Sequence, residues 1–467
     1  MASTIKVDNV QNQPGTNIVS KCGTDVTIGA SGDTVALACG ASQTGFGRTG
    51  TVDWVTTVQV TGDSPVTGVT GKGYFLNTTA GTITVNLPAG AAGSILAFKD
   101  YAGTWDSNNV TVTPNGSEKV GGIAGSTTLS TERQSVTLIY IDGTQGWLDI
   151  HDSTSAVEGP KYVTATGGTP CAGATSGDYK IHTFTGPGTL TVSCAGNAAG
   201  SNTVDYMVVA GGGGGGGEYG GGAGAGGYRE SVPSPAAWTG SPIAFSGNAR
   251  PVTATPYAIT VGGGGTGASG GCAQGSDGND SIFSDITSAG GGGGGTECEA
   301  GNAEQSGRDG GSGGGSAYYT PGPLDPRAGA GDVPNVTPDQ GFPGGLAISP
   351  GTGGHSAGGG GGSGVVGGAA PAHNVAGAGG AGVTSCISAT PTQRGGGGGG
   401  AGGGGPQPYT PGAGGAGGGG AGATDPSGAG TAGTVNTGGG GGGANLSGPS
   451  VGGTGGSGVV IIRYKFQ

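Results

Sequence analysis

Apolar residues in the first 210 positions fall in short runs that alternate with polar residues, and no run follows the helical period of 3.6. The clearest run is residues 82–87, Thr-Ile-Thr-Val-Asn-Leu, in which every second side chain is apolar. A period of two places those side chains on one face of a strand. Gly, Asn and Asp separate the runs, as is typical of tight turns. The pattern predicts an all-β protein.

Residues 51–150 are predicted to form a compact β-domain. Its expected strands are residues 54–60, 73–77, 82–87, 94–100, 110–114, 136–141 and 146–150. Spacings of roughly 8–14 residues between such runs are typical of a β-sandwich or jelly roll. Trp105 and Trp147 are expected to pack in its core or at its edge.

The flanking segments contain fewer strands. Residues 1–50 carry only short apolar steps, such as residues 26–28, and could bury a core only by trimerising or by docking onto a larger particle. Residues 151–210 predict a collar of strands at residues 179–184, 189–193 and 204–209. The last of these runs directly into seven consecutive glycines, residues 211–217.

Glycine dominates the rest of the chain. Residues 1–200 contain 31 of the 122 glycines, so the last 267 residues contain 91, about one-third of that segment. No strict Gly-X-Y period runs through it, which argues against collagen. Composition alone would favour a flexible linker. However, eight runs of four or more glycines alternate with polar and aromatic inserts, and the chain ends in an apolar strand, residues 459–464, that needs a partner.

We therefore predict that the glycine runs form a bundle of polyproline-II helices, the polyglycine-II arrangement. This helix has three residues per turn and no internal hydrogen bonds, so its N–H and C=O groups point sideways towards neighbouring helices. Glycine permits close approach on every side, and the backbone bonds between helices would replace an apolar core. Five alanines are expected on outer faces or in wider gaps: Ala223, Ala225, Ala401, Ala413 and Ala416. Residues 204–210, 257–261 and 459–464 are expected to pair and close the domain.

The predicted organisation thus has four parts. Residues 1–50 would be a segment for trimerisation or for attachment to a larger particle, and residues 51–150 a β-sandwich. Residues 151–210 would be a collar of strands, and residues 211–467 a polyglycine-II domain with a closing C-terminal strand.

Charge and hydropathy exclude several classes of function. Charged residues are 9% of the chain and the net charge is −12, which argues against nucleic-acid binding and against docking on anionic membranes. The N-terminus lacks the apolar core of a signal peptide, and no apolar run reaches 18 residues. We expect synthesis in the cytoplasm and release by cell lysis.

Cysteine and histidine give no metal signature. The seven cysteines leave three pairings open, Cys22–Cys39, Cys171–Cys194 and Cys272–Cys298, with Cys386 over. No Cys-x-x-Cys spacing occurs, so free thiols are expected, although oxidation after release could close some pairs. A metal site of His355 and His373 with Asp332 or Asp339 is conceivable, but we predict no metal and no cofactor.

No catalytic constellation stands out either. Carboxylates are scattered rather than paired, and no Ser-His-Asp order is evident, so no enzymatic activity is predicted. Matches to Gly-x-Gly-x-x-Gly carry no weight, because polyglycine matches any such pattern.

Three inserts between glycine runs carry most aromatic and charged residues of the C-terminal part. Tyr, Trp and Arg suit recognition of glycans or proteins, and loops on a rigid scaffold are where recognition usually lies. The alternative is that these side chains pack on their own loops. The candidate binding residues are Tyr228, Arg229, Trp238, Phe245 and Arg250; Tyr318, Tyr319, Asp325, Arg327, Asp332 and Phe342; and Arg394, Gln407 and Tyr409.

Several of these stretches resemble the glycine-rich domain of phage tail-fibre and adhesin proteins. The resembling pieces are residues 179–185, 204–217, 224–229, 257–262, 278–283 and, most distinctively, 455–464. The first eight residues are also similar to the start of marine-phage fibre proteins. The resemblance implies a virion protein, often a homotrimer, whose glycine-rich tip contacts the host receptor through variable loops. A long N-terminal adaptor domain is not evident.

The sequence therefore predicts a non-enzymatic tail fibre or adhesin. Its expected partners are two further copies of the chain, other virion proteins bound through the N-terminal region, and a host surface glycan or outer-membrane protein. Two alternatives stay open: a capsid fibre or decoration protein without a receptor, and a polysaccharide-degrading tail spike.

Overall fold

The computed structural model describes the backbone of residues 9–11, 17–22 and 25–28, and then residues 52–153, 160–198, 200–269, 272–297, 303–318, 327–348, 354–403, 408–423, 428–445 and 451–467. The chain divides into two compact units, Met1–Val157 and Glu158–Gln467. Strands dominate both, and the described helices are the 3-10 turns η1 (Thr61–Asp63) and η2 (Ala303–Gln305). None of the described helices has the length and apolar character to cross a membrane. The all-β prediction is confirmed.

The first unit opens with a small antiparallel sheet of β1 (Asn9–Gln11), β2 (Asn17–Cys22) and β3 (Asp25–Ile28), and β3 contains the expected strand 26–28. Two larger sheets follow, with strand orders β11-β10-β14-β13-β8-β6-β4 and β12-β9-β7-β5. Their strands are β4 (Asp53–Val60), β5 (Val66–Thr67), β6 (Lys72–Asn77), β7 (Ile83–Asn86), β8 (Ile95–Asp100), β9 (Val110–Thr113), β10 (Lys119–Val120), β11 (Ile123–Ala124), β12 (Thr127–Leu129), β13 (Ser135–Asp142) and β14 (Gly146–Ser153). Both sheets contribute to one apolar core, which includes the fully buried Trp105 and Trp147.

The spacing predicted a β-sandwich or jelly roll, folds whose strands usually pair antiparallel, but much of the pairing in this sandwich is parallel. β4, β6 and β8 pair in parallel in one sheet, and β5, β7 and β9 pair in parallel in the other. The chain therefore alternates between the sheets like a solenoid. Asp53 pairs with Lys72, and Lys72 pairs with Leu96, so successive coils are 19 and 24 residues long. Apolar runs at this spacing are compatible with antiparallel hairpins and also with a chain that crosses to the other sheet after each strand. The spacing therefore does not determine whether neighbouring strands are parallel or antiparallel.

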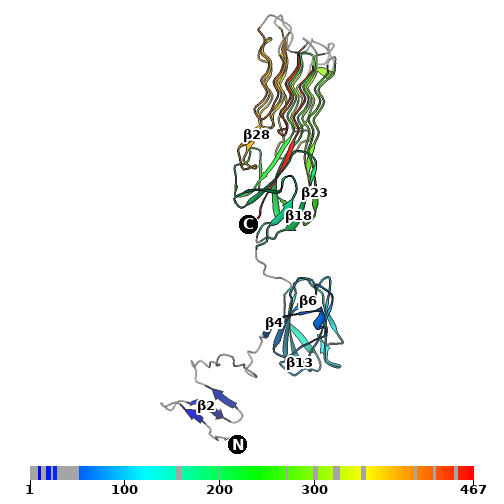
Figure 1. The fold of residues 1–467 in the computed structure, drawn as a ribbon, viewed down its shortest axis with the longest axis vertical. Helices are drawn as coiled ribbons and strands as arrows, with labels where there is room; N and C mark the ends of the chain where they lie inside the picture. The colour runs from blue at the N-terminus through cyan, green and yellow to red at the C-terminus, as the bar shows by residue number, and fades with distance from the viewer. Residues whose placement is uncertain are drawn as a thin grey trace. The chain divides into compact units, whose positions relative to one another are not determined.

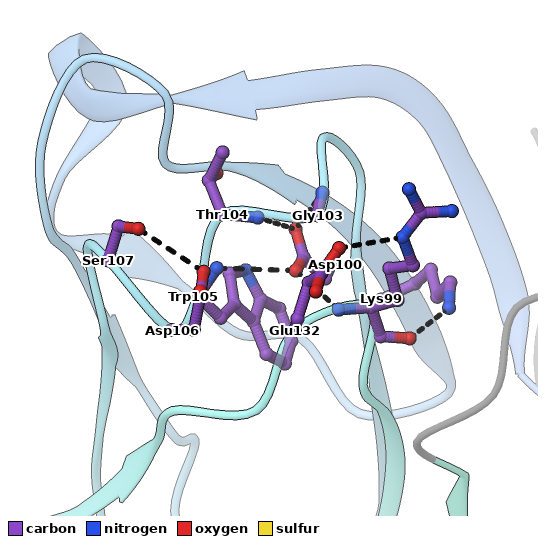
Figure 2. Close-up of polar contacts among 9 residues, drawn as sticks. Lys99, Asp100, Gly103, Thr104, Trp105, Asp106, Ser107 and Glu132 are labelled. Carbon is purple, nitrogen blue, oxygen red and sulfur yellow. Dashed lines mark hydrogen bonds and ion pairs between the residues drawn. The ribbon is translucent and has the colours of Figure 1, made fainter. Parts of the chain in front are cut away.

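Asp100 anchors the loop that leaves β8. Its buried carboxylate accepts backbone N–H bonds from Gly103, Thr104 and Trp105 at 2.9, 3.3 and 3.3 Å (Figure 2). A fourth bond, at 2.8 Å, comes from the N–H of Arg133 in the turn before β13. One side chain thus holds two loops together and seats the indole of Trp105 in the core.

The second unit has a sandwich at its base. One sheet has the order β15-β18-β23-β24-β25, and the other has the order β16-β17-β30-β19-β20-β21, with β22 paired to β19. Their strands are β15 (Val163–Thr166), β16 (Thr169–Ser176), β17 (Tyr179–Phe184), β18 (Gly188–Ala195), β19 (Thr203–Val209), β20 (Tyr228–Val232), β21 (Phe245–Ser246), β22 (Arg250–Pro251), β23 (Pro256–Thr260), β24 (Ser281–Phe283), β25 (Ile286–Ser288) and β30 (Val459–Lys465).

β19 and β30 are adjacent and antiparallel, which confirms the predicted pairing of the strand before the first glycine run with the strand after the last. Side chains at 204, 206 and 208 and at 460, 462 and 464 enter the core between the sheets. Residues 207, 209, 459 and 461 enter a second cluster on the other face. Burial of both faces explains why β30 is apolar without alternation. The expected strand 257–261 becomes β23, which pairs in the facing sheet rather than with β19 or β30.

Glycine-rich rods extend from these strands side by side (Figure 1). We use "rod" for an extended run whose backbone groups bond to neighbouring runs, and "central rod" for residues 220–227. Each N–H group of the central rod donates to a backbone carbonyl. The acceptors of residues 220 to 227 are, in order, residues 444, 295, 358, 441, 292, 361, 438 and 289. Partners recur every third residue, which is the turn of a polyproline-II helix. The predicted polyglycine-II packing is therefore present.

The carbonyl groups of the central rod are paired as well. Those of residues 220 to 225 and of residue 227 accept N–H bonds from residues 401, 216, 315, 398, 213, 312 and 210. The carbonyl of Gly226 accepts the Ser363 hydroxyl at 3.3 Å. Six surrounding rods supply these partners, so the packing is hexagonal. At about 3.1 Å per residue the rod is about 25 Å long, and all of it is buried.

This packing leaves little room for side chains. A Cβ on Gly222 or Gly224 would lie 2.0 Å from a carbonyl oxygen, that of Gly398 or Ser312 respectively. Ala223, Ala225 and Ala401 are nevertheless fully buried, so the lattice has local room for a methyl there. Ala413 and Ala416 are exposed on an outer rod, as predicted for an outer face.

Side chains complete the bonding where a neighbouring rod is missing. Asp277 and Asp280 are three residues apart, so they lie on one side of their rod. Their carboxylates accept the N–H groups of Gly293 and Gly290, at 2.9 and 2.8 Å. Asp277 also forms a bidentate ion pair with Arg308, at 2.7 Å for both bonds.

Replacing Gly222 by Ala should lower the stability of the second unit by at least about 2 kcal/mol, because a backbone clash cannot be relieved by a rotamer change. Gly263→Ala is the matched control, since its Cβ would meet only the Asn279 amide nitrogen, at 3.7 Å. Calorimetric melting of both variants tests this. Equal melting temperatures would contradict the close packing described here.

Asp100→Ala should destabilise the first unit by about 3 kcal/mol, because four backbone N–H groups lose their acceptor. Asp106→Ala is the control, since among the described residues that exposed carboxylate accepts only the Ser107 hydroxyl. Chemical denaturation of the two variants gives the difference. If Asp100→Ala were as stable as Asp106→Ala, water would be satisfying the four N–H groups in place of the carboxylate.

Candidate functional site

The rods have two ends with different chemistry. The base is the end that continues into the sandwich strands, and the tip is the opposite end (Figure 1). Three rods, residues 210–217, 311–317 and 357–363, have their tip ends at Tyr219, Tyr318 and His355. These side chains form a cluster that ties the three rods together.

His355 is the centre of this tip cluster. Its ring stacks on Tyr318 with centroids 3.8 Å apart and an interplanar angle of 18°. Tyr219 packs on it at 4.3 Å and 53°. The two tyrosines are only 6% and 5% exposed. The stack therefore fixes the tip turns in place and leaves mainly the His355 edge accessible.

A carboxylate adjoins the stack. Glu297 Oε2 lies 3.8 Å from His355 Nδ1, with side chains 24% and 28% exposed. Burial raises the pKa of the Tyr318 hydroxyl, and the charge of Glu297 raises it further. Tyr318 therefore stays protonated and can donate a hydrogen bond. Partly exposed imidazole and carboxylate groups beside buried aromatic rings suit a polar ligand such as a sugar.

Of the candidate binding residues, Tyr318, Arg327 and Tyr409 lie at the tip. Arg327 is exposed, and its carbonyl accepts the N–H of Gly307. Tyr409 is 9% exposed and lies beside Gly354, the residue before His355. Tyr319, Asp325 and Gln407 are outside the described residues.

Other candidates lie at the base, away from the tip cluster. Arg229 contacts the Thr287 carbonyl, Arg250 forms an ion pair with Asp285 at 3.1 Å, and Phe245 is 41% exposed. Asp332 is buried and accepts the N–H of Gln340 at 3.1 Å. Phe342 is half-buried in a rod, where its carbonyl accepts the N–H of Gly313.

The remaining three candidates, Tyr228, Trp238 and Arg394, belong to a polar cluster beneath the rods. Tyr228 is 2% exposed, and its hydroxyl donates to Glu230 at 2.8 Å. The Trp238 ring lies 4.1 Å from the Arg463 guanidinium. Burial lowers the pKa of Arg394. These side chains thus pack within the domain, against strands and hairpins outside their own loops.

Arg463 and Asp205 connect this base cluster to the closing strands. The Arg463 guanidinium donates to the carbonyls of Cys386 and Ile387 at 3.1 and 3.2 Å. Asp205 accepts the Ser231 hydroxyl at 2.7 Å. Burial raises the pKa of Asp205 from 3.8 to about 6, opposed by the Ser231 bond and the Arg463 charge and reinforced by the Glu230 charge.

The structure also bears on metal and thiol chemistry. His355 at the tip and Asp332 at the base are separated by the length of rod 311–317, about 20 Å, so they cannot share a metal. The described residues contain no group of three or more potential metal ligands. Cys171, Cys194 and Cys386 are free thiols, as expected, but Cys272 is disulfide-bonded. The possible disulfide partner of Cys272 in the sequence analysis is Cys298, which lies outside the described residues.

Sequence reasoning missed two members of the tip cluster, Tyr219 and Glu297, and considered His355 only as a metal ligand. A usable signal was present for Tyr219. Glu218 and Tyr219 interrupt two glycine runs, residues 211–217 and 220–222, so they had to form the turn between two rods. The contact of His355 with Tyr318 joins residues 37 positions apart and needed the packing of the rods.

Asp205→Asn tests the base cluster through its pH dependence. The folded-state pKa is above the unfolded value, so the folded state binds the proton more tightly and its stability rises as pH falls from about 7 to about 4. The variant should therefore stabilise the second unit by up to about 3 kcal/mol at pH 7.5, with a smaller gain at pH 4.5. Melting temperatures across this range measure it. If Asp205→Asn instead destabilised the second unit equally at pH 7.5 and pH 4.5, the attraction between Asp205 and Arg463 would outweigh the cost of burying the carboxylate.

Comparison with known proteins agrees with the rod architecture. A sequence family described as "Glycine-rich domain" matches residues 184–465, which is more than half of the chain. None of the curated proteins compared with the chain matches it. The matched segment begins at the end of β17, contains every rod and ends within β30. The chain therefore belongs to the glycine-rich domain family.

Proposed function

We propose that this protein is a phage tail fibre or adhesin that recognises a host surface receptor at the tip of its rods. The observation that carries the proposal is the central rod, in which every N–H and C=O group is hydrogen-bonded. Such a rod cannot bend without breaking bonds to six neighbours. It is a rigid support for the turns at its end, and recognition residues usually lie on loops held by a rigid scaffold.

The chemistry of the tip supports recognition rather than catalysis. The tip cluster joins three turns through Tyr219, Tyr318 and His355, and offers Glu297 and the His355 edge to solvent. Aromatic and carboxylate groups together suit a glycan or a polar protein surface. The family resemblance of residues 179–464 to phage adhesins favours a cell-surface receptor as the ligand. Assembly as a homotrimer and attachment through the N-terminal unit are parts of the same proposal.

Binding to whole bacteria tests the proposal with variants at the two ends of the rods. Labelled full-length protein is incubated with a panel of bacterial isolates, and adsorption is measured by cytometry. His355→Ala and Arg327→Ala should reduce adsorption to a binding isolate at least tenfold, because they alter the tip. Phe245→Ala changes an exposed residue at the base and should adsorb like the wild type.

The reverse result, loss of adsorption in Phe245→Ala alone, would place recognition at the base and contradict the proposal. Absence of adsorption to every isolate, together with labelling of the capsid by antibodies against the chain, would favour a decoration protein. Release of reducing ends from surface polysaccharide by the wild type would favour a degrading tail spike.

A further inference from the structure

The outer rods carry a side chain at every third residue, and these residues mark the limit of the lattice. In rod 376–382, the N–H groups of residues 376, 377, 379, 380 and 382 donate to neighbouring rods. Among the described residues, the N–H groups of Ala378 and Ala381 have no partner. A spacing of three places both on the same side of the rod, which is the side facing solvent.

The next rod repeats the arrangement. Rod 411–416 runs parallel to rod 376–382, since Gly379 donates to Ala413 and Gly382 donates to Ala416. Ala413 and Ala416 are exposed, and the hexapeptide Gly-Ala-Gly-Gly-Ala-Gly occurs in both rods, at residues 377–382 and 412–417. Ala432 and Thr454 are exposed in the same way on two further rods. We call Ala378, Ala381, Ala413 and Ala416 the outer alanines.

The glycines of these two rods that lie against other rods have no room for a Cβ. A Cβ on Gly379, Gly380, Gly412 or Gly415 would lie 1.9 to 2.1 Å from a carbonyl oxygen of the adjacent rod. A rod that is to receive a hydrogen-bonded neighbour therefore needs glycine on the facing side. Ala378, Ala413 and Ala416 are exposed and Ala381 is half-buried, and their methyl groups would prevent a further rod from approaching to hydrogen-bonding distance.

Unpaired N–H groups at the edge of the lattice can promote association with another chain, as the unpaired groups of an exposed edge strand do. An edge strand with unpaired N–H and C=O groups recruits another chain unless a side chain or a bulge blocks it. The outer rods present such amides at a spacing of about 9 Å, three residues at about 3.1 Å each. A second copy of this chain offers rods with the same spacing, so it is the best-matched partner for that edge.

We propose that the outer alanines terminate the lattice by blocking the lateral addition of rods from a second copy of the chain. The buried Ala223 and Ala225 do not contradict this, because the central rod is bonded to six neighbours and can offset local widening around a methyl. A rod arriving at the surface forms bonds to only one or two rods. These few hydrogen bonds cannot offset the local widening of the lattice that a methyl group requires.

Conversion of the four outer alanines to glycine tests the inference: Ala378→Gly, Ala381→Gly, Ala413→Gly and Ala416→Gly together. Sedimentation velocity over a hundredfold range of concentration should show the weight-average mass at least doubling relative to wild type, and reversing on dilution. The matched control changes four buried alanines, Ala223, Ala225, Ala357 and Ala401, to glycine. It loses the same number of methyl groups without opening a face, so its mass should stay that of the wild type.

A second variant separates loss of the Cβ from loss of stability. Serine at the same four outer positions keeps the Cβ and should not associate. Amide exchange confirms that residues 220–227 remain protected in each variant; if the fourfold glycine variant unfolds, the pair Ala413→Gly and Ala416→Gly is judged by the same criterion. A folded glycine variant with the wild-type mass at every concentration would overturn the inference, as would equal association of the serine variant.

Discussion

Hydrogen bonding between backbones that lack side chains is the interaction on which the second unit depends. Ordering one residue costs about 1–2 kcal/mol of backbone entropy, and more for glycine. A single backbone hydrogen bond returns a net of about 0.5–1.5 kcal/mol. One bond per residue therefore does not offset the loss. Residues of the central rod take part in two bonds each, but every bond is shared with a residue of another rod, so hydrogen bonding alone does not offset the loss and the rods are stable only together with the rest of the domain.

This balance between backbone entropy and hydrogen bonding explains why the rods extend from a conventional β-sandwich. β19 and β30, which precede the first rod and follow the last, pair with each other and are buried on both faces. The sandwich fixes the spacing of the strands that enter and leave the rods, so part of the ordering entropy is offset by apolar burial there. The base cluster around Arg463 and Asp205 adds polar contacts from the hairpin of β27 (Val383–Ser385) and β28 (Thr392–Arg394) to the closing strands.

The lattice also separates the roles of different side chains. Interior positions hold glycine with a few alanines and serines, edge positions use Asp277 and Asp280 in place of a missing rod, and outward positions carry small residues every third step. Clusters of larger side chains lie at the two ends. At the base they pack into the sandwich, and at the tip they form the cluster around His355. A scaffold of this kind can change its tip residues without changing its interior, which suits a recognition protein.

The sequence by itself determined the strands and the nature of the rods. Alternating apolar residues located β4, β6 and β17 to within a residue or two, and the long glycine runs showed that the rods themselves have no apolar core. Both features are local, because side-chain period and glycine content are read from neighbouring residues. Only the tertiary structure decided the parallel coils of the first unit, since an apolar alternation has no direction. It also decided which inserts lie at the tip and which at the base, because that depends on how many residues each rod needs to cross the lattice. The tip cluster itself joins residues 219, 297, 318 and 355, and the hexagonal packing of rods is what brings them together.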